Sequence, residues 1–167
     1  MARRDEFKND EVVSHEYEET IISINRCSKV VKGGRNFSFG ALVVVGNRNG
    51  KVGYGYGKAN EVADAIRKGG EIARKSVLDI PMNGVTIPHD VETRFGGAKI
   101  LLRPASTGTG LIAGGAIRSI LELGGIHDVL AKSLGSNNPL NVAKATFKAI
   151  EALTSRDQIM AKRGISK

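Results

Sequence analysis

The sequence has very little cysteine, few aromatic residues and no long apolar run. Cys27 is the only cysteine among 167 residues, which excludes an internal disulfide and a multi-thiolate metal site and fits a reducing compartment. Aromatic residues make up 5% of the chain and tryptophan is absent, so a core must be built from aliphatic side chains. No stretch reaches the roughly 18 apolar residues of a membrane-spanning helix, and the charged segment Met1–Glu6 does not resemble a secretory signal. We therefore expect a cytoplasmic protein with no membrane partner.

Proline is also scarce, with 4 residues against 21 glycines. Glycine that is frequent but not periodic excludes a collagen and indicates many tight turns or close backbone approaches. Hydrophobic residues make up 41% of the chain, which is enough for a folded core.

Acidic residues are missing from two long stretches of a chain whose formal net charge is +8. Residues 20–60 contain seven basic residues and no acid, and residues 93–121 contain four basic residues and no acid. Surfaces of soluble proteins normally mix the two signs. The two stretches therefore favour a polyanionic partner, with nucleic acid as the leading candidate and a solvated basic face without a partner as the alternative.

The hydrophobic pattern of the first half predicts three strands followed by a helix. Paired glycines after Lys32 and the Asn-Gly dipeptide that ends at Gly50 mark the two turns between the strands. Asn60 is a suitable N-cap, and apolar residues then recur at helical spacing. The expected elements are strands over residues 20–31, 37–46 and 51–57 and a helix over residues 61–77.

The third expected strand has glycine at every position of one face. From Gly53 to Gly57, glycine alternates with Val52, Tyr54 and Tyr56. A glycine face has no side chain to bury, so another backbone must approach it closely. A packed helix and an RNA backbone are the two candidates.

The second half predicts strands and helices in the order β-β-α-β-α after a break at residues 81–84. Residues 104–115 form a glycine-rich loop ahead of a helix, and Asn138 followed by Pro139 is a helix start signal. The expected elements are strands over residues 85–92 and 98–102, a helix over 116–123, a strand over 127–134 and a helix from 139.

These elements predict an α+β fold of two domains, a βββα module followed by a C-terminal α/β domain. We expect a flexible tail over residues 1–16, the first domain over 17–80, the second over 81–155 and a C-terminal extension over 156–167.

No motif in the sequence supplies a complete catalytic site. The glycine spacing of Gly108–Gly114 misses the dinucleotide fingerprint by one residue, and Gly57–Lys58 lacks the rest of a P-loop. Pro104–Ala113 resembles the phosphate loop of the small-metabolite kinases, but Ile112 and Ala113 replace its hydroxyl pair. The three histidines are isolated and no nucleophile stands beside a base. We expect no catalytic residue, no metal site and no cofactor.

The basic turn between the first two strands is the strongest candidate binding site. Its glycines let phosphates approach backbone N–H groups, while lysine and arginine neutralise the phosphate charge. Such contacts give affinity and position rather than sequence recognition. Strand aromatics, including Phe37 and Phe39, could stack on unpaired bases, although alternating aromatics of this kind are more often core residues. The candidate RNA-binding residues are Arg26, Lys29, Lys32, Gly33, Gly34, Arg35, Arg48, Lys51, Tyr54, Tyr56 and Lys58.

Four segments carry a family resemblance, and they are Ser28–Phe39, Gly50–Lys58, Arg103–Gly115 and Ala131–Pro139. In this order they resemble the family of bacterial small-ribosomal-subunit protein five, over about residues 18–153. Gly40 and Ala63 depart from the family, which usually has threonine and proline there.

The resemblance implies a double-stranded-RNA-binding-like first domain and a second domain that shares its fold with the kinases but not their chemistry. It implies a structural constituent of the small ribosomal subunit that binds 16S ribosomal RNA, stabilises the head relative to the body and influences translational accuracy. The turn around Lys32 would reach toward the neck between head and body. The implied neighbours are ribosomal proteins four and eight, and messenger RNA near its entrance. The implied protein-interface residues are Gly108, Gly110 and Arg118 toward protein four, and Lys162 and Arg163 toward protein eight.

Two other function classes stay open. A free-standing RNA chaperone or translational repressor would have the same charge pattern, and co-sedimentation with small subunits distinguishes it. A small-metabolite kinase would share the glycine-rich loop, and a purified protein that binds no ATP excludes it.

Overall fold

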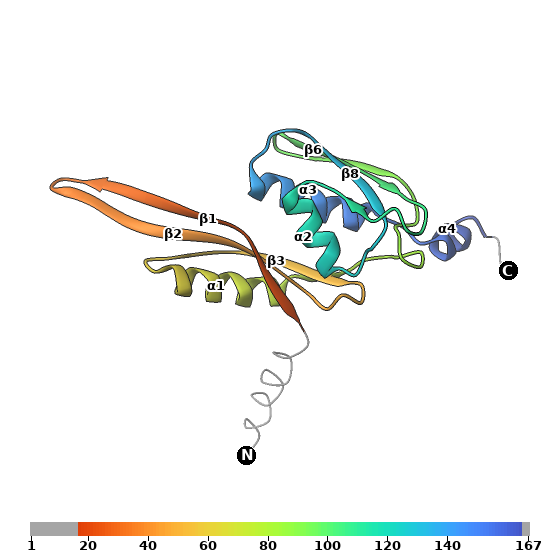
Figure 1. Ribbon diagram of the computed structural model, residues 1–167, viewed down its shortest axis with the longest axis horizontal. Helices are drawn as coiled ribbons and strands as arrows, with labels where there is room; N and C mark the ends of the chain where they lie inside the picture. The colour runs from red at the N-terminus through yellow and green to blue at the C-terminus, as the bar shows by residue number, and fades with distance from the viewer. Residues whose placement is uncertain (1–16, 165–167) are drawn as a thin grey trace, which may run out of the picture.

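The first half of the chain forms an antiparallel sheet with one covering helix. The computed structural model describes residues 17–164, so the expected tail over residues 1–16 lies outside the described residues. The strand order of the first sheet is β1-β2-β3-β4, and α1 lies along one face of it (Figure 1). The elements are β1 (Glu18–Val31), β2 (Gly34–Gly46), β3 (Lys51–Ala59), α1 (Val62–Lys75) and β4 (Val77–Asp79).

A helix, not an RNA backbone, covers the glycine face of β3. A Cβ atom at Gly53, Gly55 or Gly57 would collide with a carbonyl oxygen of α1. The small residues of α1 that face β3, among them Ala65 and Gly69, are buried. The glycines therefore let the helix backbone lie directly on the strand, which confirms the helix alternative.

Both ends of α1 differ from the prediction. Its N-cap is Glu61 with no side-chain cap hydrogen bond, so the expected cap at Asn60 is wrong by one residue. The helix ends at Lys75 because Val77 begins β4, which pairs with the start of β3. The Ser76 hydroxyl at this junction donates to the Tyr54 carbonyl oxygen over 2.7 Å.

The second half of the chain forms a mixed sheet with helices on one side. The strand order is β5-β6-β8-β7, in which β7 runs parallel to β8 and the other pairs are antiparallel. The Asn138 side chain accepts from the Leu140 N–H and so caps α3 as predicted. The elements are β5 (Val91–Phe95), β6 (Ala98–Pro104), β7 (Leu111–Ile112), α2 (Gly115–Leu123), β8 (Val129–Gly135), α3 (Pro139–Ala152) and α4 (Arg156–Lys162).

The expected strand over residues 85–92 is wrong over most of its length. Only an isolated bridge between Asn83 and Thr86 forms before β5 begins at Val91. Pro88 has no N–H to donate to a neighbouring strand, and the Val85 carbonyl accepts from the loop before β8 instead.

The helix α4 lies in the segment predicted as an extension. Ser155 and Gln158 form a reciprocal capping box at its start. This Ser-x-x-Gln pattern is the sequence signal for the helix, since seven residues are too few for a clear periodicity.

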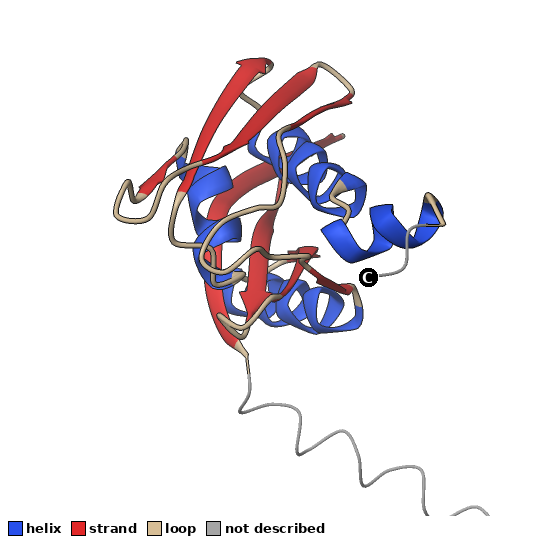
Figure 2. Ribbon diagram, turned by 90° about the vertical axis from the view of Figure 1, so that its right-hand side faces the viewer, coloured by secondary structure: helices blue, strands red, loops and turns tan. Residues whose placement is uncertain are grey.

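One apolar core joins the two halves of the molecule. Leu42, Val44 and Val52 of the first sheet belong to the same buried cluster as Ile100 and Ile120 of the second half. α2 and α3 lie between the two sheets, so the layers follow the order α1, first sheet, α2 with α3, second sheet (Figures 1 and 2). The predicted boundary at residue 81 falls between β4 and β5. Over residues 17–164, none of the helices is long and apolar enough to cross a membrane.

Candidate nucleic-acid interface

The β1–β2 hairpin projects beyond the rest of the fold. β3 stops pairing with β2 at the pair Phe39 and Ala59, and from there to the turn only the two strands continue (Figure 1). The turn contains Lys32 and Gly33, and Gly33 has a φ of 103°, which side-chain-bearing residues rarely adopt. We call residues 26–39 the projecting hairpin.

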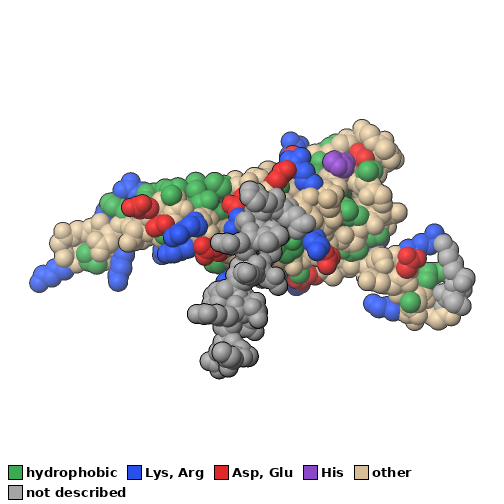
Figure 3. Space-filling model, turned by 90° about the horizontal axis from the view of Figure 1, so that it is seen from below, with side chains coloured by type: hydrophobic (Ala, Val, Ile, Leu, Met, Phe, Trp, Pro, Cys, Tyr) green, Lys and Arg blue, Asp and Glu red, His purple; other side chains and the backbone are tan. Residues whose placement is uncertain are grey.

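Both faces of the projecting hairpin carry a cation. Paired residues in an antiparallel ladder share a face, and successive residues alternate. Arg26 pairs with Phe39 and Val30 with Arg35, which places Arg26 and Arg35 on one face, whereas Lys29 pairs with Asn36 on the other. The side chains of Lys and Arg extend from this narrow end of the molecule (Figure 3).

The cations of the projecting hairpin are exposed and free of carboxylate partners. Arg26, Lys29, Lys32 and Arg35 form no ion pair with any residue from 17 to 164. The Arg26 guanidinium lies 3.6 Å from the centroid of the Phe37 ring, which is 45% exposed. This contact orients Arg26 without neutralising it, so its charge stays available to an anion.

The structure separates two predicted basic residues from the projecting hairpin and places a third at its base. Arg48 and Lys51 lie at the far end of β2 and β3, about 40 Å from the turn by the length of β2. Arg48 also pairs with Glu18 over 2.8 Å. Lys58 lies opposite Gly40, at the base of the hairpin.

The two tyrosines of β3 have different environments. The Tyr54 ring packs on Phe147 of α3 with 4.5 Å between the ring centroids. Of the two predicted roles, stacking on RNA and packing in the core, this contact favours the core. Tyr56 is 37% exposed and lies over Gly40, where a Cβ atom would collide with its hydroxyl oxygen. The glycine at residue 40 therefore leaves room for this ring.

The glycine-rich loop before α2 already binds an anion of the protein itself. The N–H groups of Gly108 and Gly110 both donate to Oδ1 of Asp128, over 3.1 and 2.7 Å. Asp128 is 5% exposed, and sequence reasoning missed it because about 20 residues separate it from the loop. The two donors that could cradle a phosphate are thus used by a buried carboxylate.

The predicted protein-interface residues lie on two surfaces. Gly108, Gly110 and Arg118 share the first, because the Arg118 guanidinium donates to the Leu111 carbonyl oxygen over 3.1 Å. Lys162 and the C-cap Arg163 are exposed at the end of α4, opposite the projecting hairpin (Figure 1).

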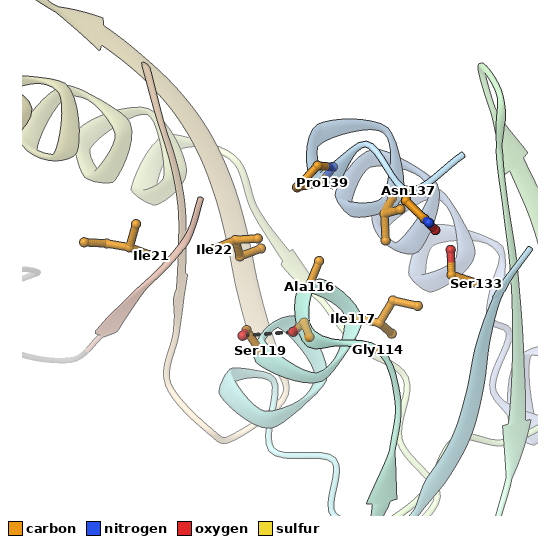
Figure 4. Close-up of a pocket in the computed structure, with 11 residues that line it drawn as sticks. Ile21, Ile22, Gly114, Ala116, Ile117, Ser119, Ser133, Asn137 and Pro139 are labelled. Atoms are coloured by element: carbon orange, nitrogen blue, oxygen red, sulfur yellow. Dashed lines mark hydrogen bonds between the residues drawn. The ribbon is translucent and has the colours of Figure 1, made fainter. Parts of the chain in front are cut away.

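A hollow of about 380 Å³ lies between β1 and the start of α2 and α3 (Figure 4). Ile21 and Ile22 line one side, and Ala116 and Ile117 line the other. The Ser119 hydroxyl donates to the Gly115 carbonyl oxygen over 3.1 Å, inside its own helix. The hollow is therefore mainly apolar and presents no charged side chain.

The two histidines in the described part of the chain have different environments. His89 is held by the Asp90 carbonyl oxygen at Nδ1, 2.7 Å away, and by the Thr154 N–H at Nε2, 3.1 Å away. His127 is exposed, and His15 lies outside the described residues. From residue 17 to 164, no three His, Cys, Asp or Glu side chains gather as metal ligands would.

Comparison with known sequences agrees with both halves of this structure. The model of the ribosomal protein S5 N-terminal domain matches residues 17–81, and that of the ribosomal protein S5 C-terminal domain matches residues 93–163. The chain belongs to the ribosomal protein S5 family. A relative in this family, the small ribosomal subunit protein uS5 of Protochlamydia amoebophila (strain UWE25), is 54% identical over 167 residues, covering 99% of this chain and 100% of the relative. The S5 N-terminal domain contains the projecting hairpin, and the S5 C-terminal domain contains the glycine-rich loop and α4.

Proposed function

We propose that this S5 family member is a non-catalytic constituent of the small ribosomal subunit, in the bacterial cytoplasm, and binds 16S ribosomal RNA through the projecting hairpin. The observation that carries the proposal is an acid-free hairpin with exposed, unpaired cations on both of its faces. Lysine and arginine that neutralise phosphates supply most of the affinity of such binding. Family membership supports the ribosomal setting.

The mechanism follows from the two-sided charge of the hairpin. RNA helices repel each other through their phosphates, and a cationic ribbon between them reduces this repulsion. Lys29 meets phosphates on one side while Arg26 and Arg35 meet them on the other. No atom lies within 4 Å of the position that a Cβ would take at Gly33 or Gly34, so a phosphate can approach the turn closely. Held in this way, the head of the subunit keeps its position relative to the body.

The second half provides the protein contacts in this proposal. The surface of Gly108, Gly110 and Arg118 faces ribosomal protein four, and the end of α4 with Lys162 and Arg163 faces protein eight, with messenger RNA close to its entrance. Translational accuracy then depends on whether the first of these interfaces holds or loosens as the subunit closes. Arg118→Ala is expected to change the signal of a misreading reporter more than the yield of subunits. A flat reporter together with depleted subunits contradicts this part of the proposal.

The Asp128 contacts weaken the kinase alternative. The loop N–H groups that would bind a phosphate already donate to a carboxylate of the protein. The RNA chaperone or repressor alternative keeps the same hairpin but predicts a protein that sediments apart from small subunits.

Chemical footprinting of 16S ribosomal RNA, with and without the protein, tests the proposal. We expect protection of RNA backbone by the wild-type protein and its loss in a Lys32→Glu, Arg35→Glu variant. The matched control is Lys68→Glu, Lys75→Glu, which changes the net charge equally on the exposed side of α1. Unchanged protection in the hairpin variant, or equal loss in the control, would reject the hairpin as the binding site.

A further inference from the structure

A second group of aromatic and basic residues lies away from the projecting hairpin, where α3 faces β3 and the end of β5. The protein has five phenylalanines and three tyrosines, and three of these eight rings line one cavity of about 360 Å³. We call this cavity the aromatic pocket. Its lining residues are Tyr54, Phe95, Lys144, Phe147, Lys148 and Glu151.

The inner wall of the aromatic pocket is closely packed and its rim is exposed. Tyr54 and Phe147 pack ring on ring with an interplanar angle of 44°, and Phe147 is only 3% exposed. Phe95, the last residue of β5, is 38% exposed. The pocket thus combines a packed aromatic wall with one accessible ring.

The two lysines of the aromatic pocket have no carboxylate partner in the described structure. Lys144 Nζ lies 5.2 Å from the centroid of the Phe95 ring, and Lys148 Nζ lies 3.4 Å from the Arg94 carbonyl oxygen. Glu151 is exposed at the rim and forms no ion pair with either lysine. Two cations against one carboxylate favour an anionic ligand.

We propose that the aromatic pocket binds one unpaired nucleotide of RNA, with its base stacked on Phe95 and its phosphate at Lys144 and Lys148. The proposal rests on the RNA binding proposed above and adds a second contact to it. Proteins recognise unpaired bases by stacking them on aromatic rings beside cations. The Lys144 contact to Phe95 is long, so an incoming base can replace the ammonium, which then stays within reach of the phosphate.

The geometry of β3 connects the aromatic pocket with the projecting hairpin. Tyr54 and Tyr56 lie on the same face of the strand, because they pair with Val44 and Leu42. Tyr56 is the exposed ring between the pocket and the hairpin base.

An acidic peptide would use the lysines alone, whereas an RNA strand uses the lysines and the rings.

Tryptophan fluorescence tests this site, because the protein has no tryptophan of its own. A Phe95→Trp variant is titrated with a short unstructured oligoribonucleotide and with an abasic strand of equal length and charge. Ile72→Trp, on the exposed side of α1, is the control probe. We expect saturable quenching of the Phe95→Trp variant by the oligoribonucleotide only, and weak or no quenching of the control.

A second variant tests the contribution of stacking to affinity. Phe95→Leu keeps an apolar side chain but removes the ring, and is expected to bind the oligoribonucleotide about tenfold more weakly. Binding of the wild-type protein to a fully paired RNA duplex is measured in parallel, because a duplex offers phosphates to the hairpin but no free base.

The possible results separate the pocket from the proposed function. Equal quenching by the abasic strand, equal quenching of the Ile72→Trp control, or a response to polyglutamate in place of RNA would overturn the pocket. If the wild-type protein binds the duplex but the single-stranded oligoribonucleotide does not quench the Phe95→Trp variant, the pocket is overturned while the hairpin proposal stays intact. If neither RNA binds, both proposals fail.

Discussion

Gly57 lies directly beneath α1, and helix backbone takes the space that a side chain would need. A Cβ atom at this position would collide with the Ala65 carbonyl oxygen and lie 2.5 Å from the Gly69 nitrogen. Backbone atoms in a packed helix cannot rotate away as a side chain can. The glycine is therefore required for packing and not for RNA contact.

Gly57→Ala is expected to lower the free energy of unfolding by about 1–3 kcal/mol or more, because α1 must shift away from β3. Gly34→Ala is the control, since no atom lies within 4 Å of a Cβ built there. Urea denaturation of both variants measures the difference. A Gly57→Ala variant as stable as Gly34→Ala would contradict the close packing of α1.

Asp128 is the residue of the second half whose structural contribution is easiest to isolate. Its Oδ1 atom accepts from two loop N–H groups, and its side chain is buried. Asp128→Ala is expected to lower the free energy of unfolding by about 1–3 kcal/mol, because both donors lose their acceptor. Asp128→Asn, which keeps an acceptor oxygen, is expected to lose less. Denaturation curves for both variants that coincide with the wild-type curve would show that these hydrogen bonds contribute nothing.

Among the elements, the projecting hairpin combines exposed apolar residues with cations on opposite faces. Val30 is 73% exposed and Phe37 is 45% exposed, so the hairpin does not serve to build a core. Lys29 and Arg35 face in opposite directions because they belong to neighbouring pairs of the ladder. Two separate RNA surfaces can therefore meet the same ribbon.

Lys29→Ala and Arg35→Ala are each expected to weaken RNA binding by about 1 kcal/mol, and their effects are expected to add in the double variant. Additivity follows because the two side chains reach different phosphates. Filter binding to 16S ribosomal RNA measures the affinities of the wild type, the two single variants and the double variant. If one single variant matches the wild type, only one face of the hairpin meets RNA.

The sequence predicts the strands of the projecting hairpin well, but not which distant residues lie close together in the fold. The alternation of apolar residues, the glycine turn and the Asn-Gly turn are local signals, and they place β1, β2 and β3 within a few residues. Arg48 and Lys51 are predicted to bind RNA together with the hairpin residues because they lie in the same acid-free stretch. The fold places them at the opposite end of β2 and β3. The Asp128 contacts and the aromatic pocket join residues far apart in the chain, which no local pattern indicates.

At the scale of the whole molecule, the continuous core links the two sheets into one structural unit. Side chains of β2 and β3 lie in the same buried cluster as those of α2, α3 and β6. Separating the halves would expose aliphatic surface and the contact between Tyr54 and Phe147.

The protein is therefore expected to unfold in a single cooperative transition, with the same midpoint for probes in each half. Phe147→Ala is expected to destabilise the protein by about 3–5 kcal/mol, and the midpoints of both probes should fall together. Single tryptophans introduced at Ile72 and at Leu134 report on the two halves. Two separate transitions in the wild-type background would contradict a shared core.

The salt dependence of RNA affinity shows whether the projecting hairpin binds RNA through phosphate contacts. Each phosphate contact adds about 0.7–0.9 to the slope of log affinity against log salt concentration. The wild-type protein should bind 16S ribosomal RNA with a steep slope, and replacing Arg26, Lys29, Lys32 and Arg35 with alanine should lower that slope by roughly 3. An affinity that stays constant as salt rises, or a slope that the four substitutions leave unchanged, would show that the hairpin does not bind RNA through phosphates.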